Sequence, residues 1–428
     1  MAPLLLLLLI AATALGPAAA NLRIFAGQQV LRIVPTSESH VKVLQQLESD
    51  ESLQLDFWRP ASRVGLPADV RVPVEAQEVV ARTLQGAGLS PQVMIPDIEL
   101  LTKAERAEMA AARRAQSLAA RSTDTFNYES YHVLPEINTW MQDMVREYPS
   151  LVSLINIGST YENRDIPVLK IGAGGGSKPA IFVATGIHAR EWVTVATGIW
   201  IAKKLVSEYG QDSAITSLLN TMDWYFEIVA NPDGYVYTHE RDRMWRKTRS
   251  QYSGNSCVGT DPNRNFAAGF GGPGSSSSSC TETYRGPSAH SESEVQAIVN
   301  FVQAHPEITS FIDVHSYSQM LIFPFGYKNQ LAPDHTELNN LAKSAVTALT
   351  SLYNTKYTYG PIITTIYQAS GGSIDWTYEA AKVRYSYCFE LRDTGRYGFI
   401  LPANQILPTA QETWLAIKVI AEHVRDSS

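Results

Sequence analysis

The sequence is poor in cysteine and has no strong excess of charge of either sign. Three cysteines in 428 residues are too few for a fold built on disulfides, and they leave room for one bridge and one unpaired thiol. The 35 basic residues are outnumbered by 42 acidic ones, giving a net charge of −7, so we expect no nucleic-acid partner. With 45% hydrophobic and 18% charged residues, the chain is neither disordered nor fibrous and should fold compactly.

Long hydrophobic runs are missing except at the N-terminus. Residues Leu4 to Ile10 are apolar and are followed by small residues that end in Ala18-Ala19-Ala20, the pattern of a secretory signal peptide without its usual basic start. The alternative, a membrane anchor, is disfavoured because the run is shorter than the roughly 20 residues that cross a bilayer. We therefore expect a signal peptide at residues 1–20, a secreted, extracellular protein and no membrane partner.

Residues 21–121 have balanced charge and the pattern of a small α+β unit. Strand-like segments and segments with helical spacing follow the order β-α-β-β-α-β, at residues 30–34, 41–47, 53–57, 70–74, 79–84 and 92–95. This order predicts a ferredoxin-like unit. Such a unit is common and indicates no chemistry by itself.

A connecting helix is predicted after this unit. Thr102 and Glu105 have the spacing of a capping box, and the residues that follow are rich in Ala, Arg and Glu, so we expect an exposed helix starting near Thr102. Its arginines, Arg113 and Arg114, and the later Arg121 are targets for a trypsin-like protease. An ordinary charged linker is the alternative.

The rest of the chain alternates apolar strand candidates with amphipathic helices. The strand candidates are residues 168–171, 180–184, 224–230, 308–314 and 383–391, and the helices include residues 192–209 and 291–304. This alternation predicts an α/β sheet with helices on both faces.

One histidine pattern suggests a metal site. His188 and Glu191 form an H-x-x-E just after an apolar strand candidate, and open α/β sheets place their sites at strand ends. A second strand candidate ends on His315. Imidazole and carboxylate groups are zinc ligands, so these three residues form a candidate site if their strands are neighbours. Otherwise His315 is better explained as a hydrogen-bonded core histidine.

Two further groups of polar residues have both a functional and a structural interpretation. Glu390 ends an apolar strand and is either a general base or a buried partner of Arg392. The run from Asp261 to Asn265, Asp-Pro-Asn-Arg-Asn, offers an arginine and an amide that suit a carboxylate, or it is a capped turn. Arg246, between Trp and Lys, is a weaker candidate that a charged surface patch would explain.

Taken together, several short motifs carry a resemblance to a known family. They are His188-Ala-Arg-Glu191-Trp192, Asn231-Pro-Asp-Gly, Trp245-Arg-Lys-Thr-Arg, Asp261-Pro-Asn-Arg-Asn, His315-Ser-Tyr-Ser, Ile366-Tyr-Gln-Ala-Ser-Gly-Gly-Ser-Ile-Asp-Trp and Phe389-Glu-Leu-Arg-Asp-Thr-Gly. In their order and spacing they resemble the zinc metallocarboxypeptidases, specifically the pancreatic-type procarboxypeptidase A branch. The likeness covers the chain from Asn21 onward.

The resemblance implies a zinc-dependent hydrolysis of the C-terminal peptide bond. His188, Glu191 and His315 would bind Zn²⁺, one ion per chain, which lowers the pKa of a water to about 7 and polarises the carbonyl. Glu390 would be the general base. Arg246 would stabilise the oxyanion.

The resemblance also implies how the substrate is held. Asn263, Arg264 and Tyr367 would bind the terminal carboxylate, which every enzyme that acts at a C-terminus must recognise, with Arg190 as a secondary contact. Asp261 would orient His188, as the ligand histidines of metal sites generally require.

The resemblance assigns the specificity pocket to apolar residues. Ile374 is at the position that is acidic in relatives cutting after basic residues, and Ile362, Ile366 and Ala369 would complete a wall suited to aromatic or aliphatic side chains. Cys388 replaces the expected Thr or Ala, which leaves open the preference among hydrophobic residues.

The same resemblance implies a disulfide between Cys257 and Cys280. It would close a loop over a Gly/Ser-rich run and contribute about 3 kcal/mol to stability. Cys388 would then be the unpaired thiol, acting as a small buried hydrophobic residue.

We therefore predict a secreted zymogen. Residues 1–20 are the signal peptide, residues 21–121 the activation propeptide with its connecting helix, and residues 122–428 a catalytic domain with a mixed twisted sheet between helices. Its partners would be peptide or protein C-termini and an activating trypsin-like protease, and we expect a monomer.

Two rival functions agree less well with the sequence. A non-catalytic peptide-binding protein on this fold would lack a metal ligand or the base, and none is missing from the sequence. A zinc amidohydrolase or small-acyl deacylase would lack the carboxylate-binding set of Asn263, Arg264 and Tyr367.

Overall fold

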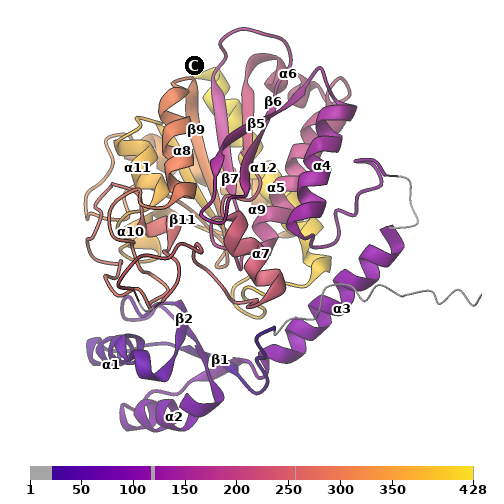
Figure 1. Ribbon diagram of the computed structural model, residues 1–428. Helices are drawn as coiled ribbons and strands as arrows, with labels where there is room; N and C mark the ends of the chain where they lie inside the picture. Colours follow the sequence, from indigo (N-terminus) through magenta and orange to yellow (C-terminus); the bar gives the residue numbers. More distant parts are fainter. Residues whose placement is uncertain (1–21, 117–120, 256, 428) are drawn as a thin grey trace, which may run out of the picture.

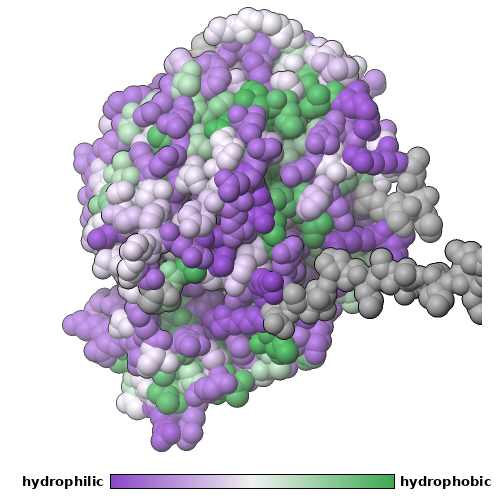
Figure 2. Space-filling model, in the orientation of Figure 1, coloured by the Kyte–Doolittle hydropathy of each residue, from purple (hydrophilic) through white to green (hydrophobic). Residues whose placement is uncertain are grey.

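The computed structural model describes residues 22–116, 121–255 and 257–427. The predicted signal peptide lies outside the described residues. The chain forms a smaller N-terminal unit beneath a larger one (Figure 1). On the face seen in Figure 2, both units are mainly hydrophilic, with small hydrophobic areas. Within the described residues, the structure contains no helix that is long and apolar enough to cross a membrane.

The smaller unit is an antiparallel sheet with two helices, in the predicted ferredoxin-like order. Its elements are β1 (Gln29–Ile33), α1 (Glu38–Ser49), β2 (Asp56–Arg59), β3 (Ala68–Val72), α2 (Gln77–Gly86) and β4 (Gln92–Ile95), with strand order β2-β3-β1-β4. The predicted strand at residues 53–57 begins late, because Asp50 caps a short 3₁₀ turn by accepting a hydrogen bond from the Ser52 amide.

The connecting helix α3 (Ile98–Gln116) differs from the prediction in its start and its exposure. It begins four residues before Thr102, whose hydroxyl donates to the Glu99 carbonyl inside the helix, so the predicted capping box is wrong. One face of α3 is buried rather than exposed. Glu105 forms a bidentate ion pair with Arg243 of the larger unit, with N–O distances of 2.6 and 2.9 Å.

The larger unit contains an eight-stranded sheet. Its strands are β5 (Val152–Ser159), β6 (Asp165–Ile171), β7 (Ala180–Thr185), β8 (Asp223–Glu227), β9 (Ile308–Ser316), β10 (Met320–Phe323), β11 (Thr358–Pro361) and β12 (Tyr385–Leu391). Its helices are α4 (Leu134–Glu147), α5 (Trp192–Glu208), α6 (Ser213–Thr221), α7 (Pro232–Glu240), α8 (Ser293–Ala304), α9 (His335–Tyr353), α10 (Ile362–Thr365), α11 (Ser373–Glu379) and α12 (Ile406–Asp426).

The sheet is mixed and covered on both faces, as predicted. Its order is β11-β10-β12-β9-β7-β8-β6-β5, and β12, β9, β7 and β8 are parallel to one another. Apolar residues of α4, α5, α9 and α12 pack on one face, and those of α8 and α11 pack on the other (Figure 1). The parallel strands bring their carboxyl ends to the same edge, where α/β sheets bind ligands.

Candidate active site

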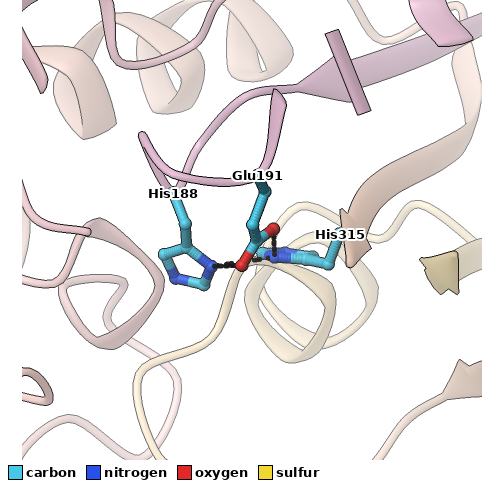
Figure 3. Close-up of side chains that lie close together, drawn as sticks. All are labelled: His188, Glu191 and His315. Atoms are coloured by element: carbon cyan, nitrogen blue, oxygen red, sulfur yellow. Dashed lines mark hydrogen bonds and ion pairs between the residues drawn. The ribbon is translucent and has the colours of Figure 1, made fainter. Parts of the chain in front are cut away.

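The strand that precedes His188 and Glu191 and the strand that contains His315 are neighbours, as the site requires. β7 and β9 pair in parallel, so the loop after β7 brings His188 and Glu191 next to His315 near the end of β9 (Figure 3). The Nδ1 atoms of the two histidines are 3.0 Å apart. Glu191 places Oε1 2.8 Å from His188 Nδ1 and Oε2 3.2 Å from His315 Nδ1.

The chemistry of these three donors fits zinc. All three side chains are buried, and their candidate ligand atoms lie within 4.8 Å of one another. In a tetrahedral site with Zn–N bonds of about 2.0 Å, neighbouring donor atoms are about 3.3 Å apart, close to the separations found here. Desolvation opposes ionisation of Glu191, but the two histidines outweigh it and lower the pKa of this carboxyl below its ordinary value.

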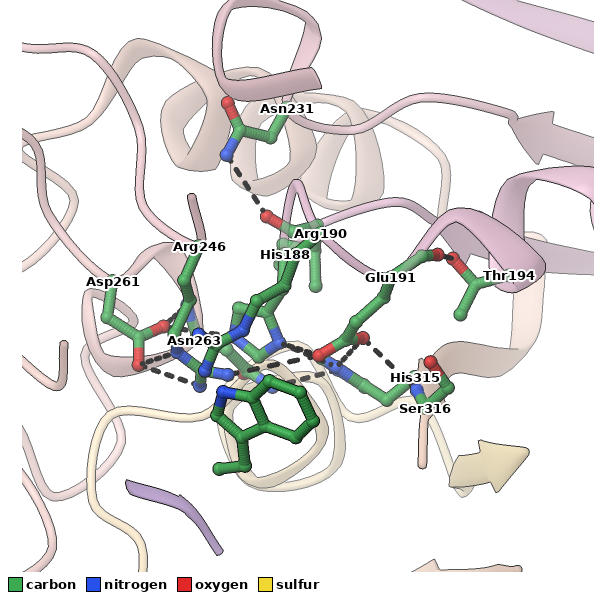
Figure 4. A network of polar contacts seen from close by, with 12 residues as sticks. His188, Arg190, Glu191, Thr194, Asn231, Arg246, Asp261, Asn263, His315 and Ser316 are labelled. Carbon is green, nitrogen blue, oxygen red and sulfur yellow. Dashed lines mark hydrogen bonds and ion pairs between the residues drawn. The ribbon is translucent and has the colours of Figure 1, made fainter. Parts of the chain in front are cut away.

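A second carboxylate supports the histidine that follows β7. Asp261 Oδ1 lies 3.1 Å from His188 Nε2, and its Oδ2 accepts a hydrogen bond of 2.9 Å from Arg246 Nη2 (Figure 4). Asp261 is fully buried. Desolvation raises its pKa, but the positive charge of Arg246 outweighs this and the pKa stays well below its usual range, so an anion faces His188 Nε2.

Glu390 is in register with His315 across the β12–β9 pair. Its alternative role as the partner of Arg392 is not found, because Arg392 donates instead to Glu412 with a 2.7 Å bond from Nε. Desolvation raises the pKa of the half-buried Glu390 carboxyl to about 8, against the opposing effect of His315.

The predicted carboxylate-binding residues line the same cavity as the predicted metal ligands. Asn263, Arg264 and Tyr367 all border it, as does Arg246. Arg264 is fixed by donating from Nε to the Gly274 carbonyl at 2.7 Å. Arg264 also lies next to Tyr367, whose ring centre is 6.0 Å from the guanidinium carbon.

Apolar residues form another wall of this cavity. Ile362, Ile366, Ala369 and Ile374 line it together with Cys388. Cys388 is a buried free thiol, as predicted. The predicted disulfide joins Cys257 to Cys280.

The smaller unit covers the mouth of the cavity, as expected of an inhibitory propeptide, although the sequence did not indicate which of its residues make the contact. Trp58 and Arg59 of β2 line it. Next to them, Asp56 Oδ2 accepts a 2.8 Å hydrogen bond from Arg190 Nη1. Arg190, predicted as a secondary substrate contact, is therefore engaged by the N-terminal unit and is only 1% exposed. The only signal for this contact in the sequence is a single aspartate within the predicted strand at residues 53–57.

Comparisons with known proteins place the chain in a family. A profile of the zinc carboxypeptidases matches residues 137–416, and a profile of the carboxypeptidase activation peptide matches residues 31–105. The chain belongs to the zinc carboxypeptidase family. It is a metallocarboxypeptidase of the carboxypeptidase A type, and its activation peptide makes it a zymogen.

Individual relatives agree with this assignment. The zymogen is 55% identical to carboxypeptidase A1 of Sus scrofa over 399 residues, which cover 93% of this chain and 94% of that protein. It is 51% identical to carboxypeptidase A2 of Rattus norvegicus over 402 residues, 94% of this chain and 95% of that one. The carboxypeptidase A structure from Helicoverpa armigera matches with a TM-score of 0.85 and 30% identity, covering 95% of this chain and 99% of that one. The family implies a zinc cofactor.

Proposed function

We propose that the activated enzyme removes C-terminal aromatic or aliphatic residues from peptides and proteins. One observation carries this proposal: a single cavity is lined by the His188–Glu191–His315 group, by Arg264 and by Ile374. A metal centre, a carboxylate-binding arginine and an apolar wall are the three parts that such an enzyme needs within reach of one terminal residue. A deacylase would not need the arginine.

In this proposal His188, Glu191 and His315 hold one zinc ion per chain. When bound, zinc would act as a Lewis acid that polarises the scissile carbonyl and lowers the pKa of a water, so that this water can be deprotonated near neutral pH. Glu390 takes the proton of the attacking water and passes it to the leaving amine. Arg246 stabilises the negative charge that develops on the carbonyl oxygen, because its guanidinium is already fixed by Asp261.

The substrate's terminal carboxylate is assigned to Asn263, Arg264 and Tyr367. An arginine and an amide provide donors that match a carboxylate, and both border the cavity. The terminal side chain then extends along Ile374. Arg190 contacts residues further from the terminus, once Asp56 has left it.

We further propose that residues 1–20 direct secretion, that residues 21–121 are removed on activation, and that residues 122–428 are the mature enzyme, acting as a monomer. A trypsin-like protease is expected to cut near Arg121. Arg121 pairs with Asp143 at 3.0 Å through an exposed side chain, so it is reachable at the surface. The disulfide between Cys257 and Cys280 suits an oxidising extracellular environment.

The direct test is a release assay combined with metal analysis. The purified proprotein, treated with trypsin and checked by mass spectrometry, is expected to contain one zinc per chain and to release Phe or Leu from the C-terminus of a peptide. The same peptide with an amidated C-terminus should be a poor substrate. Equal hydrolysis of the free and amidated peptides would contradict an exopeptidase that recognises a carboxylate.

Asp56→Asn is expected to make the unprocessed zymogen leaky. Asp56 is 3% exposed, and of its donors Trp58, Arg71 and Arg190 only Arg190 belongs to the larger unit. The substitution weakens this charged hydrogen bond, worth about 1.5–3 kcal/mol. That corresponds to a rise of roughly 10- to 100-fold in the activity of uncleaved protein. Hydrolysis of a small Phe-ended substrate by the intact proprotein measures it.

The matched control for this variant is Glu51→Gln. Glu51 also links the two units, by accepting from the Ser278 hydroxyl at 2.6 Å, but at an exposed site. We expect little change in the activity of this control. An Asp56→Asn zymogen as silent as the wild type would show that the Asp56–Arg190 pair does not hold the cleft closed.

A further inference from the structure

A buried aspartate lies directly behind one of the proposed zinc ligands. Asp313 and His315 are two residues apart on β9, so their side chains emerge on the same face of the sheet. Asp313 Oδ2 is 3.0 Å from His315 Nε2, and the two side chains are 0% and 2% exposed. Asp313 therefore faces His315 Nε2 as Asp261 faces His188 Nε2. Unlike Asp261, which lies on a loop, Asp313 is on the same strand as the histidine it contacts.

The position of this carboxylate determines which ring nitrogen of His315 carries a proton. A carboxylate oxygen at 3.0 Å from Nε2 repels a lone pair and attracts a proton, so it favours the tautomer in which Nε2 carries the proton. The lone pair is then on Nδ1, the atom that faces His188 Nδ1 and Glu191. A metal-binding histidine needs this arrangement, with its second nitrogen held by an acceptor.

Asn263 offers a competing partner for the same nitrogen. Its Nδ2 lies 3.0 Å from His315 Nε2 (Figure 4). If Asn263 donated to Nε2, the proton of the neutral ring would be on Nδ1, where it would block the proposed ligand atom. A metal-binding His315 therefore needs an acceptor at Nε2, which Asp313 offers, and the amide of Asn263 is then left to donate to a substrate.

Asp313 is itself fixed from a third element. The Ser373 hydroxyl, at the start of α11, donates to Asp313 Oδ2. The Ser373 amide donates to Asn263 Oδ1 at 2.8 Å. Ser373 directly precedes Ile374, so Asp313 connects the proposed zinc ligand to the helix that carries the proposed specificity residue.

We propose that Asp313 is a positioning residue that orients His315 and fixes its tautomer for zinc binding. The inference rests on the proposed metal site of His188, Glu191 and His315. It gives that site two carboxylate–histidine pairs, one from a loop and one from β9. Asp313 touches neither substrate nor metal in this role and acts through His315.

The test is zinc affinity, measured by chelator competition on the full proprotein. Removing such a partner typically lowers metal affinity about 10- to 100-fold, and this is the loss expected for Asp313→Ser. Asp313→Asn keeps the shape and an acceptor oxygen but not the charge, so its loss should be smaller. Asp223→Asn is the matched control: Asp223 is a buried aspartate of the same sheet that pairs with Lys170 and Lys178, and its replacement should leave zinc affinity unchanged even if stability falls.

A spectroscopic measurement separates positioning from general damage. In the zinc-loaded wild type, nitrogen-15 NMR should show His315 protonated at Nε2 and slow exchange of that proton, and Asp313→Ser should speed the exchange. Asn263→Ala should change neither zinc affinity nor the tautomer. If the wild type binds zinc and Asp313→Ser binds it as tightly, or if Asn263→Ala causes the loss instead, Asp313 has no such role. Failure of the wild type to bind zinc would instead overturn the proposed metal site.

Discussion

Glu390→Gln is expected to yield an enzyme that folds, keeps its zinc and loses turnover by about 10²- to 10⁴-fold, the usual contribution of a positioned general base. The substitution preserves the shape of a half-buried side chain at the end of β12. It removes no proposed metal ligand. It also leaves the Arg392–Glu412 pair intact, so the fold loses no known contact.

The measurement is kcat on a Phe-ended peptide for trypsin-activated protein with its zinc content determined. Glu422→Gln provides the control. Glu422 is a surface residue of α12 whose carboxylate lies 3.9 Å from the Lys418 ammonium, and the turnover of this variant should match that of the wild type. A fully zinc-loaded Glu390→Gln enzyme with near-wild-type turnover would remove Glu390 from the mechanism.

The parts of the site that are predictable from the sequence are those marked by local patterns. The spacing of His188 and Glu191 after an apolar strand makes them candidate ligands but is a weak signal by itself, and Glu390 stands out as a charge in an apolar strand. The convergence of His315 with them depends on the strand order, which spacing does not give. The pairing of β7 with β9 settles that point.

Residues whose role depends on distant partners cannot be assigned from local patterns. Asp313 lies within an apolar strand, and although its proposed partner His315 is only two residues away, the hydroxyl that fixes its carboxylate belongs to Ser373, which is 60 residues away in the sequence. Asp56 likewise gains its role from Arg190, 134 residues further on. In both cases the signal is an aspartate within a predicted strand, and the structure shows that its carboxylate is buried, which is costly unless the charge is paired.

The fold is predictable where hydrophobic periodicity is strong. Alternation indicates two of the four strands of the ferredoxin-like sheet, predicted at residues 53–57 and 70–74. The short strands β10 and β11 show no alternation of apolar and polar residues and are not among the predicted strands. The predicted start of α3 is wrong because Thr102 hydrogen-bonds within the helix instead of capping it. A serine or threonine with the spacing of a capping box can either cap a helix start or donate to a backbone carbonyl inside the helix, and the spacing does not distinguish the two.

The largest expected effect on specificity comes from Ile374. This residue is 3% exposed, in the first turn of α11, and faces the cavity with Ile366 and Cys388. An ammonium or guanidinium placed there without a partner costs several kcal/mol in desolvation. We therefore expect the wild type to prefer Phe-, Tyr- or Leu-ended peptides over Lys- or Arg-ended ones by roughly 10²-fold or more.

The neighbouring Asp375 does not provide the missing partner. Its two oxygens already accept hydrogen bonds from the amides of Gly326 and Tyr327. Desolvation raises the pKa of its carboxyl to about 7, so it carries less negative charge at neutral pH than an ordinary aspartate. A basic side chain entering this pocket would meet a partly neutral acid whose acceptor sites are occupied.

Ile374→Asp is accordingly expected to raise kcat/KM for an Arg-ended peptide and to lower it for the matched Phe-ended one, because it adds a charge partner and removes apolar surface. Ile374→Asn separates these effects, since an uncharged amide should weaken the Phe-ended substrate without helping the Arg-ended one. Each activated protein is assayed on both peptides. If the wild type cuts both peptides equally well, Ile374 does not line the specificity pocket and the hydrophobic-terminus assignment is wrong. If the Asp and Asn variants behave alike on the Arg-ended peptide, Ile374 does not set the charge preference of the pocket.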